Sequence, residues 1–286
     1  MIHTPTNLAL KSKGIYVRSN FDEWQHQWPV HTHLGLEVYL FIQGNANYVI
    51  EDDIYELLPG DMLLFSGDVI HRVNPSKDVR YVRSYVNFMP SFLEEHVPPE
   101  LYSKLLSLFD SPNGLRIRWS PDEREEMERF FNSLSQEMER EAFGHNYMLK
   151  TQLTQMLLCI YRKSKHLIEM SPNQQHSPIQ VNVRRILQSL NQNFTETISL
   201  DELAKMHHLS KYYMCHSFKE VTGYTINSYV MQKRVEEAKK MLLTKDDSIS
   251  SISEKLGFNT TVHFSRTFKQ YAGASPQMYR KISADC

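Results

Sequence analysis

The sequence carries the pattern Phe218-Lys219-x-x-x-Gly223-x-Thr225-x-x-x-Tyr229 and carries it again as Phe268-Lys269-x-x-x-Gly273-x-Ser275-x-x-x-Tyr279. Each position of the second copy lies 50 residues after its counterpart, as 268 lies after 218. The two copies are identical at four of the five positions and have Ser in place of Thr at the fifth. Such a repeat is typical of one supersecondary unit that is used twice.

Each copy belongs to a segment that predicts a short helix, a turn and a second helix. In the first segment Leu200–His207 is followed by Lys211–Val221, and Ser199 begins the short helix as in a capping box. In the second segment Ile249–Leu256 is followed by Thr261–Tyr271. This order is that of a helix-turn-helix unit, which places its second helix in the major groove of DNA.

The second helix of each unit is predicted to turn an apolar pair at i and i+4 inward and to present its other face to DNA. Arg266 is the strongest candidate for reading a base, because its guanidinium group matches O6 and N7 of guanine. Ser210 and Lys211 lie at a helix N-terminus, which suits a phosphate. For every such residue the alternative is a solvated surface position. The predicted DNA-facing residues are Ser210, Lys211, Tyr212, Cys215, His216 and Lys219 in the first unit and Thr260, Thr261, Val262, His263, Arg266 and Lys269 in the second.

The two units are joined by a predicted helix, Ile226–Leu243, which would be about 27 Å long. That length can hold two recognition helices about 34 Å apart, which is one turn of B-DNA. From Pro178 onward the chain has 15 Lys and Arg against 10 Asp and Glu, although the whole chain has a net charge of −1. A basic C-terminal part suits a DNA partner, but an excess of this size also occurs in ordinary proteins.

Residues from about 15 to 90 predict β-structure, because short apolar runs alternate with turn signals as in a barrel or a sandwich. The expected strands are Leu36–Ile42, Ala46–Ile50, Met62–Phe65 and Val79–Phe88. Between about 91 and 162 the apolar period becomes helical, and a helix is predicted to begin at Ser120-Pro121. Two amphipathic helices of this kind either cover the barrel or form a dimer interface.

Three histidines and a glutamate form a candidate ligand set in the predicted barrel. His31, His33 and Glu37 are separated by even numbers of residues, so their side chains would share one face of a strand. Together with His71 they suit a divalent metal such as Zn, Mn, Fe or Ni. The alternatives are an effector pocket without metal and a purely structural role. Trp28 and Tyr39 offer stacking faces for a sugar-like effector, or else belong to the core.

Composition sets the remaining limits. No apolar run of about 18 residues predicts a membrane span, and the first 13 residues do not resemble a signal peptide. The three cysteines, Cys159, Cys215 and Cys286, are odd in number and far apart, which fits a reducing cytoplasm. We therefore expect a cytoplasmic protein with no membrane partner.

The domain organisation predicted from these patterns is of the α+β class. Residues 1–162 are expected to form an effector-binding and dimerisation domain with a barrel and helices. The polar, helix-breaking segment 163–178 is the predicted linker. Residues 179–286 are expected to form an all-α domain with two helix-turn-helix units.

The stretch from His31 to Gly44 resembles the first motif of the cupin superfamily, with its HxH, its Glu37 and its closing glycine. The second cupin motif is matched less well, because residues 66–71 lack the proline and have one more residue before His71. The resemblance implies a small β-barrel that binds a ligand at its mouth.

The C-terminal part resembles the DNA-binding domain of the AraC/XylS family of transcription regulators. This resemblance implies a homodimer that binds double-stranded DNA, responds to a small molecule, often regulates sugar or other catabolic genes, and contacts RNA polymerase if it is an activator. The matching residues are Leu203-Ala204, Leu209-Ser210, Phe218-Lys219, Gly223, Arg234, Ala238, Leu242, Ile252, Gly257-Phe258, Phe264-Ser265-Arg266, Phe268-Lys269, Gly273, Ser275-Pro276 and Tyr279-Arg280.

A transcription regulator without catalytic activity is thus the function we expect. The alternatives are a metal-dependent cupin enzyme fused to a DNA-binding module, and a regulator that responds to the metal itself.

Overall fold

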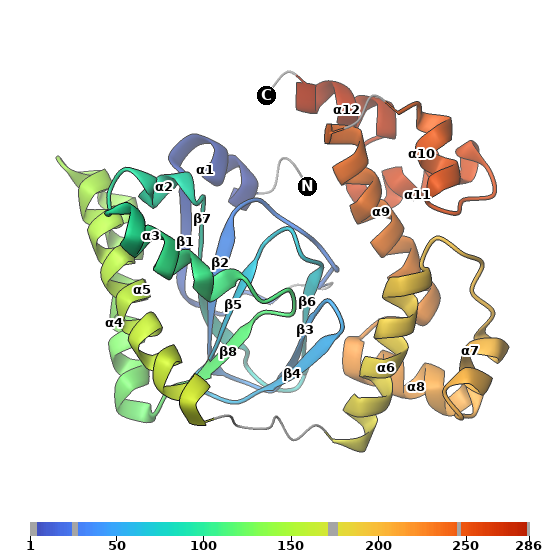
Figure 1. Cartoon of the computed structure of the whole chain (residues 1–286), viewed down its shortest axis with the longest axis horizontal. Coiled ribbons are helices and arrows are strands. Elements are labelled where there is room, and N and C mark those ends of the chain that lie inside the picture. Colours follow the sequence, from blue (N-terminus) through green and yellow to red (C-terminus); the bar gives the residue numbers. More distant parts are fainter. Residues whose placement is uncertain (1–4, 25–27, 171–176, 245–246, 285–286) are drawn as a thin grey trace.

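A computed structural model describes residues 5–24, 28–170, 177–244 and 247–284. The strands and the helices up to residue 170 form one body, and the helices from residue 178 onward form a second one beside it (Figure 1). The protein therefore has two domains, an N-terminal β-sheet domain with helices and a C-terminal domain that is entirely helical. This arrangement confirms the predicted fold class.

The N-terminal domain is built on two antiparallel sheets that face each other. One has five strands in the order β1-β7-β2-β5-β8, and the other has three in the order β4-β3-β6. Aromatic side chains such as Phe41, Tyr48 and Phe65 fill much of the space between them. The strands are β1 (Ile15–Phe21), β2 (Leu36–Gln43), β3 (Ala46–Ile50), β4 (Asp53–Leu57), β5 (Asp61–Ser66), β6 (His71–Pro75), β7 (Val82–Phe88) and β8 (Leu115–Arg118).

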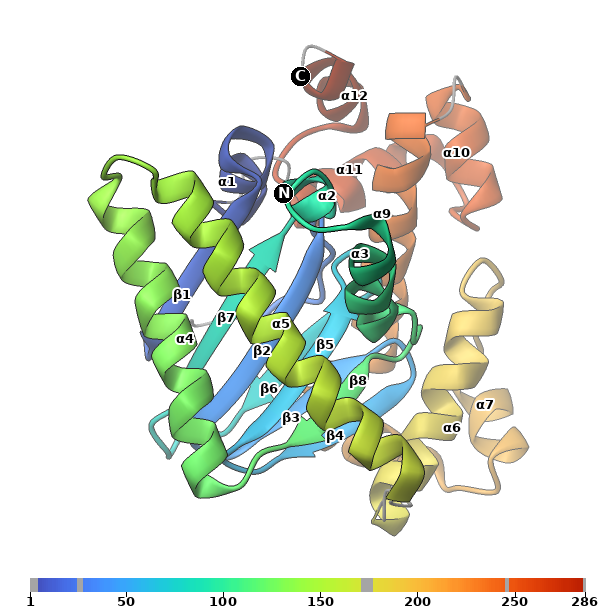
Figure 2. The same ribbon diagram turned by 60° about the vertical axis from the view of Figure 1, so that its left-hand side comes forward.

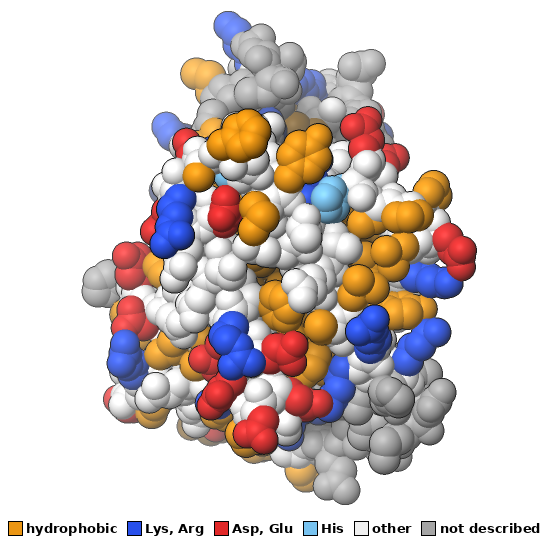
Figure 3. All heavy atoms as spheres, turned by 90° about the vertical axis from the view of Figure 1, so that its left-hand side faces the viewer, with side chains coloured by type: hydrophobic (Ala, Val, Ile, Leu, Met, Phe, Trp, Pro, Cys, Tyr) orange, Lys and Arg blue, Asp and Glu red, His pale blue; other side chains and the backbone are white. Residues whose placement is uncertain are grey.

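The outer face of the five-stranded sheet is covered by α4 (Pro121–Arg140) and α5 (His145–Met170) (Figure 2). Phe131 and Leu153 of these helices are fully buried in one cluster with Val38 and Val86 of the sheet. The helix pair therefore covers the sheet, which is one of its two predicted roles, and the dimer interface stays a prediction. Figure 3 shows the molecular surface on this side, where hydrophobic side chains lie among acidic and basic ones.

Several details of this domain differ from the sequence prediction, among them the strands β1, β4 and β6, which were not among the four expected strands. Strand β8 lies inside the segment 91–162 that was expected to be helical. It was not predicted because only four residues pair with β5, and their apolar pattern is too short to detect. A short helix, α1 (Pro5–Lys13), precedes β1. Helix α5 continues to Met170, past the predicted start of the linker at residue 163, since the proline that disfavours helix follows only at position 172. The other short elements are α2 (Ser91–Glu94), α3 (Pro99–Leu106) and η1 (Ser107–Phe109).

The C-terminal helices confirm the predicted double helix-turn-helix, and each boundary of the four unit helices agrees to within one residue. Ser199, Ser210, Ser248 and Thr260 cap the four unit helices with their side-chain oxygens, which accept the backbone N–H three residues on. The helices are α6 (Pro178–Asn193), α7 (Leu200–Met206), α8 (Lys211–Thr222), α9 (Ile226–Thr244), α10 (Ile249–Lys255), α11 (Thr261–Ala272) and α12 (Pro276–Ala284).

Arg234 on the joining helix α9 holds the two units together. Its side chain is 5% exposed and donates hydrogen bonds to the backbone oxygens of Phe194 (2.6 Å), Glu196 (2.7 Å) and Gly257 (2.7 Å). Charge-assisted hydrogen bonds of this kind are shorter and stronger than neutral ones. One guanidinium group thus ties the α6–α7 connection of the first unit to the turn of the second.

The two domains share a hydrophobic interface. Val30, Val49, Ile54 and Ile70 of the barrel lie in one buried cluster with residues of α6, α8 and α9. The guanidinium group of Arg72 stacks on the ring of Tyr224 at 3.7 Å from its centroid. Among the described residues no helix combines the length and the apolar character that a membrane span requires.

The turn of the second unit depends on a glycine. Gly257 has φ +73°, and a Cβ there would lie 1.7 Å from the backbone oxygen of Thr195. Gly273 has a similar φ of +80°, but a Cβ there would meet nothing within 4 Å. We expect Gly273→Ala to lower the free energy of unfolding by about 1–2 kcal/mol through backbone strain alone. Gly257→Ala should cost at least about 1–3 kcal/mol more because of the clash.

Urea unfolding of the two variants, followed by circular dichroism, measures this difference. Equal losses of stability would contradict the close approach of the turn to Thr195.

Candidate functional site

The outer face of α8 is exposed as the sequence predicted. Tyr212 is 80% exposed, and the side chain of His216 is 63% exposed and stacks beside it with ring centroids 6.0 Å apart. Lys219 is exposed one turn after His216. Cys215 is less accessible than these residues, because it is half-buried. Met214 and Phe218 on the inward face are fully buried, so the outer face of α8 is the one available to a partner.

The outer face of α11 is the corresponding surface of the second unit. Val262 is 80% exposed, and His263, Arg266 and Lys269 are exposed, while Thr261 is half-buried. Arg266 has no ion pair within 4.0 Å in the described part of the chain. Its five N–H donors are therefore free to pair with a ligand of matching geometry.

Two residues predicted to contact DNA also have structural roles. The side chains of Ser210 and Thr260 accept hydrogen bonds from the backbone N–H groups of Tyr213 (3.2 Å) and His263 (3.1 Å). Lys211 forms an exposed ion pair with Asp201 at 2.9 Å. The structure thus places all twelve predicted residues at or near the exposed side of α8 and α11, and it assigns two of them to helix caps.

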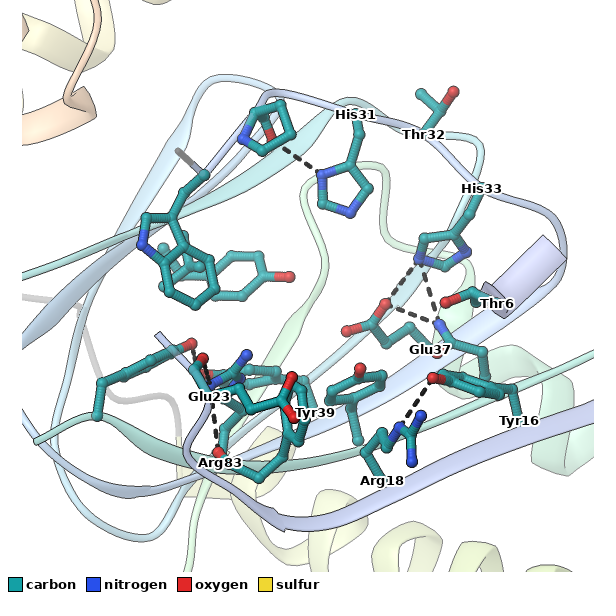
Figure 4. Close-up of a pocket in the computed structure, with 18 of the residues that line it drawn as sticks. Thr6, Tyr16, Arg18, Glu23, His31, Thr32, His33, Glu37, Tyr39 and Arg83 are labelled. Carbon is teal, nitrogen blue, oxygen red and sulfur yellow. Dashed lines mark hydrogen bonds and ion pairs between the residues drawn. The ribbon is translucent and has the colours of Figure 1, made fainter. Parts of the chain in front are cut away.

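The second site is a cavity of about 500 Å³ between the two sheets of the N-terminal domain (Figure 4). Its wall comes from the inner faces of β1, β7 and β2, where neighbouring strands place their lining residues side by side. Polar groups and rings alternate along this wall, and the opposite face of the same sheet packs against the helices. The lining residues from these strands are Tyr16, Arg18, Phe21, Glu37, Tyr39, Arg83, Tyr85 and Asn87.

His31 and His33 line one end of the cavity, and His71, which does not line it, lies against them. One ligand atom of each lies within 4.8 Å of the others, and the ring centroids of His31 and His71 are 4.3 Å apart. His31 and His33 precede β2 instead of lying on a strand as predicted, and His31 pairs with His71 through an isolated β-bridge. Gly67 makes room for His33, because a Cβ there would lie 2.2 Å from its Nδ1.

The backbone fixes the orientation of all three imidazole rings. Nδ1 of His31 lies 2.9 Å from the oxygen of Pro29, that of His33 2.9 Å from the oxygen of Leu34, and that of His71 2.8 Å from the oxygen of Val69. A backbone oxygen can only accept, so each Nδ1 carries the proton. Nε2 of His71 is buried without a hydrogen-bond partner in the described residues.

Glu37 is held by His33 and Asn87 and does not join the cluster of the three histidines. Its Oε2 lies 2.7 Å from Nε2 of His33 and accepts a hydrogen bond from Nδ2 of Asn87 at 2.8 Å. Burial favours neutral His33, but the hydrogen bond and charge of Glu37 outweigh it, so the pKa of His33 is raised. Burial together with neighbouring histidines lowers the pKa of His31 and places that of His71 well below its usual value.

The predicted aromatic residues Trp28 and Tyr39 both line the cavity. Arg83, Tyr85 and Asn87 also line the cavity from one face of β7 and were not predicted from the sequence. Their spacing of two residues was a usable signal, because side chains two apart on a strand share a face. Their common wall with Glu37 depends on strand register, which the sequence alone does not specify.

The cavity also reaches the C-terminal domain. Thr32 lies between His31 and His33, and its side chain points away from theirs (Figure 4). Its hydroxyl donates a hydrogen bond to Oε2 of Glu236 on α9 at 2.7 Å. Tyr271 at the end of α11 is part of the cavity lining. Both contacts join segments that are far apart in the sequence, so no local pattern could reveal them.

Two exposed recognition-type helices and a lined cavity define a DNA-binding protein with a ligand-binding domain. A family model described as an AraC-like ligand binding domain matches residues 14–157, and one described as a helix-turn-helix domain matches residues 203–282. The chain belongs to the AraC family of helix-turn-helix transcription regulators.

Curated relatives cover nearly the whole chain. The uncharacterized HTH-type transcriptional regulator YdeC of Bacillus subtilis is 21% identical over 90% of this chain and 87% of its own length. The HTH-type transcriptional activator RhaR of Enterobacter sp. is 23% identical over 91% of this chain and 89% of its own length. The crystal structure of ToxT from Vibrio cholerae aligns with 96% of this chain and 98% of its own at 14% identity, with a TM-score of 0.37.

Arg266 provides a test of the second recognition helix. We expect Arg266→Ala to weaken binding to a selected DNA site by about 1–3 kcal/mol and to relax one base preference. Arg129→Ala, which removes an exposed arginine from α4, is the matched control and should bind as the wild type does. Electrophoretic mobility shift titrations at fixed salt measure both affinities. Equal affinity of Arg266→Ala and wild type would show that α11 does not read DNA as described.

Proposed function

We propose that this protein is a one-component transcription regulator in which a small molecule in the barrel cavity changes how α8 and α11 are presented to DNA. The observation that carries the proposal is the position of Thr32. The residues on either side of it turn into the cavity, and its own hydroxyl binds Glu236 of the helix that joins the two units. A ligand that moves His31 or His33 therefore acts directly on α9.

The surroundings of Glu236 make this contact energetically significant. Glu236 is 2% exposed and also pairs with Lys239 of its own helix. A hydrogen bond to a charged group contributes about 1.5–3 kcal/mol, and a buried carboxylate that loses a partner is destabilised. The effector needs only to prefer one arrangement of Thr32 over another, because an equilibrium shifts by the difference in affinity between two states.

Charged and polar groups also hold the two domains together at three other positions. Lys233 of α9 pairs with Glu51 at 2.9 Å, and Arg184 of α6 pairs with Asp53 at 2.8 Å. Asn74 donates hydrogen bonds to the last carbonyls of α8. The first recognition helix is thus held by the barrel, so its position relative to α11 is sensitive to how the domains are docked.

The test of the proposal is Thr32→Val, which removes the hydroxyl and keeps the shape of the side chain. We expect the affinity of the full-length protein for its selected DNA site to change by about five-fold or more, the lower end of typical coupling between sites. A loss of affinity would mean that this docked arrangement binds DNA tightly, and a gain would mean that it binds DNA weakly.

Thr154→Val is the matched control, because the Thr154 hydroxyl bonds only within α5, to the oxygen of Lys150. Its affinity for DNA should equal that of the wild type. If Thr32→Val also leaves the affinity unchanged, the link between cavity and DNA-binding helices is refuted.

A metal-responsive regulator is a second candidate, and the three histidines favour it. Metal-bound histidines typically donate their other ring N–H to a carbonyl or carboxylate, as the Nδ1 atoms of His31, His33 and His71 do. This leaves the Nε2 atoms of His31 and His71 for a divalent ion such as Zn²⁺ or Ni²⁺, whereas Nε2 of His33 would have to exchange its contact with Glu37 for the metal. The buried and unpartnered Nε2 of His71 fits such a ligand. Glu37 contacts the nitrogen of His33 that would bind the ion, and its own binding to the metal stays a prediction.

We expect purified full-length protein to bind one Co²⁺ ion, seen by visible absorption, and His71→Ala to weaken this binding by more than about tenfold. His145→Ala, on α5 away from the cavity, is the control. Metal binding that survives His71→Ala, or that is lost equally in His145→Ala, would place the ion elsewhere.

The remaining parts of the proposed function follow from the exposed surfaces. Phe143, Tyr147 and Met148 at the α4–α5 turn are exposed apolar residues, and we propose that a homodimer forms through this region. A protein that acts on DNA belongs in the cytoplasm of a bacterial cell, where RNA polymerase is its partner if it activates.

The relatives named above are regulators, which favours a non-catalytic role over a cupin enzyme.

A further inference from the structure

The end of the cavity away from the histidines holds a buried arginine. Arg83 is 4% exposed, and its guanidinium carbon lies 4.4 Å from the ring centroid of Phe21, 4.7 Å from that of Tyr81 and 5.0 Å from that of Trp28. On β7 it is four residues from Asn87, which corresponds to about 13 Å along the strand. Figure 4 places Arg83 and Arg18 on the opposite side of the cavity from His31 and His33.

The charge of Arg83 has no acidic partner in the described part of the chain. Nη1 donates to the backbone oxygens of Phe21 and Glu23, both at 3.2 Å, and no carboxylate lies within 4.0 Å of the guanidinium group. Glu37 is held at the other end by His33 and Asn87. A buried charge without an opposite charge is costly, so such groups are normally paired.

The surroundings of Arg83 are those of an anion-binding site with aromatic walls. Arg18 also lines the cavity, and its Nε donates to the hydroxyl of Tyr16 at 2.8 Å. Glu23 lines the same end, but it is exposed and makes no ion pair with either arginine. The volume of about 500 Å³ lies in the range of pockets for small organic ligands.

We infer that the cavity binds a small organic acid whose carboxylate pairs with Arg83 while its body lies between the rings of Phe21, Trp28 and Tyr81. A guanidinium group binds a carboxylate through two parallel hydrogen bonds, which a neutral sugar cannot offer. Sugar acids and aromatic acids share this chemistry. The inference rests on the proposed function, in which this cavity holds the effector.

Matched probes separate charge from shape. Benzoate and benzamide differ chiefly in charge, as do glucuronate and glucose, and each is added to the full-length protein up to about 10 mM, weak binding being expected of fragments this small. Binding is followed by the thermal unfolding midpoint and by tryptophan fluorescence, because Trp28 lies beside Arg83. We expect at least one acid to bind tenfold or more tightly than its neutral counterpart. Selectivity for benzoate alone identifies an aromatic acid, and selectivity for glucuronate alone identifies a sugar acid.

Three variants assign the selectivity to Arg83. Arg83→Gln should abolish the preference for the acid, whereas Arg116→Gln should keep it. Arg116 is on β8, lies over the ring of Tyr55 on β4 and does not line the cavity. Glu23→Gln should bind the acid more tightly, since it removes a competing negative charge from the same end. These opposite signs distinguish loss of an anion site from general damage to the fold.

The inference is overturned if the neutral probes bind as tightly as the acids, if the preference survives Arg83→Gln, or if no acid binds at 10 mM. Each of these results leaves the proposed function standing, because that function is tested without any ligand by the DNA affinity of Thr32→Val. Conversely, an acid-selective cavity together with an unchanged Thr32→Val would remove the regulatory link and keep the binding site.

Discussion

The buried polar side chains of α9 are the constraint on which the rest of the molecule depends. Gln232, Lys233, Arg234 and Glu236 follow one another almost without interruption, and all are less than 8% exposed. Each must find a partner because a buried charge or hydrogen-bonding group is costly when unpaired. Lys233 and Glu236 find theirs in the barrel, and Arg234 finds its partners in both helix-turn-helix units. One helix thereby sets the position of the barrel and of both recognition helices.

The five-stranded sheet explains how a small cavity forms beside this helix. Its outer face is apolar and packs on α4 and α5, while its inner face carries charged and aromatic side chains at alternate positions. The segment before β2, which includes His31, Thr32 and His33, closes the cavity on the remaining side. The same segment contacts α9. One side of this short stretch of backbone therefore lines the cavity, and its other side forms part of the domain interface.

The sequence predicted the C-terminal domain closely because its signals are local. Caps such as Ser210 and Thr260 and the repeated phenylalanines fix each helix within a few residues. The histidines were also found, although His31 and His33 lie in a loop and not on the predicted strand. Arg83 and the Thr32–Glu236 contact were missed, because they depend on strand register and on how two domains dock. Such information is distributed over segments up to 204 residues apart.

Coupling between two binding sites is reciprocal, so DNA must act on the cavity if the cavity acts on DNA. Amide hydrogen exchange of the full-length protein, with and without its selected DNA site, tests this most directly. The amides of His31 and His33 bond to the oxygens of His71 and Gly67, so their exchange reports on the segment that carries Thr32. We predict that DNA binding changes exchange at residues 30–34 and leaves the β2–β5 pairing unchanged. Identical exchange of residues 30–34 in free and DNA-bound protein would contradict the account.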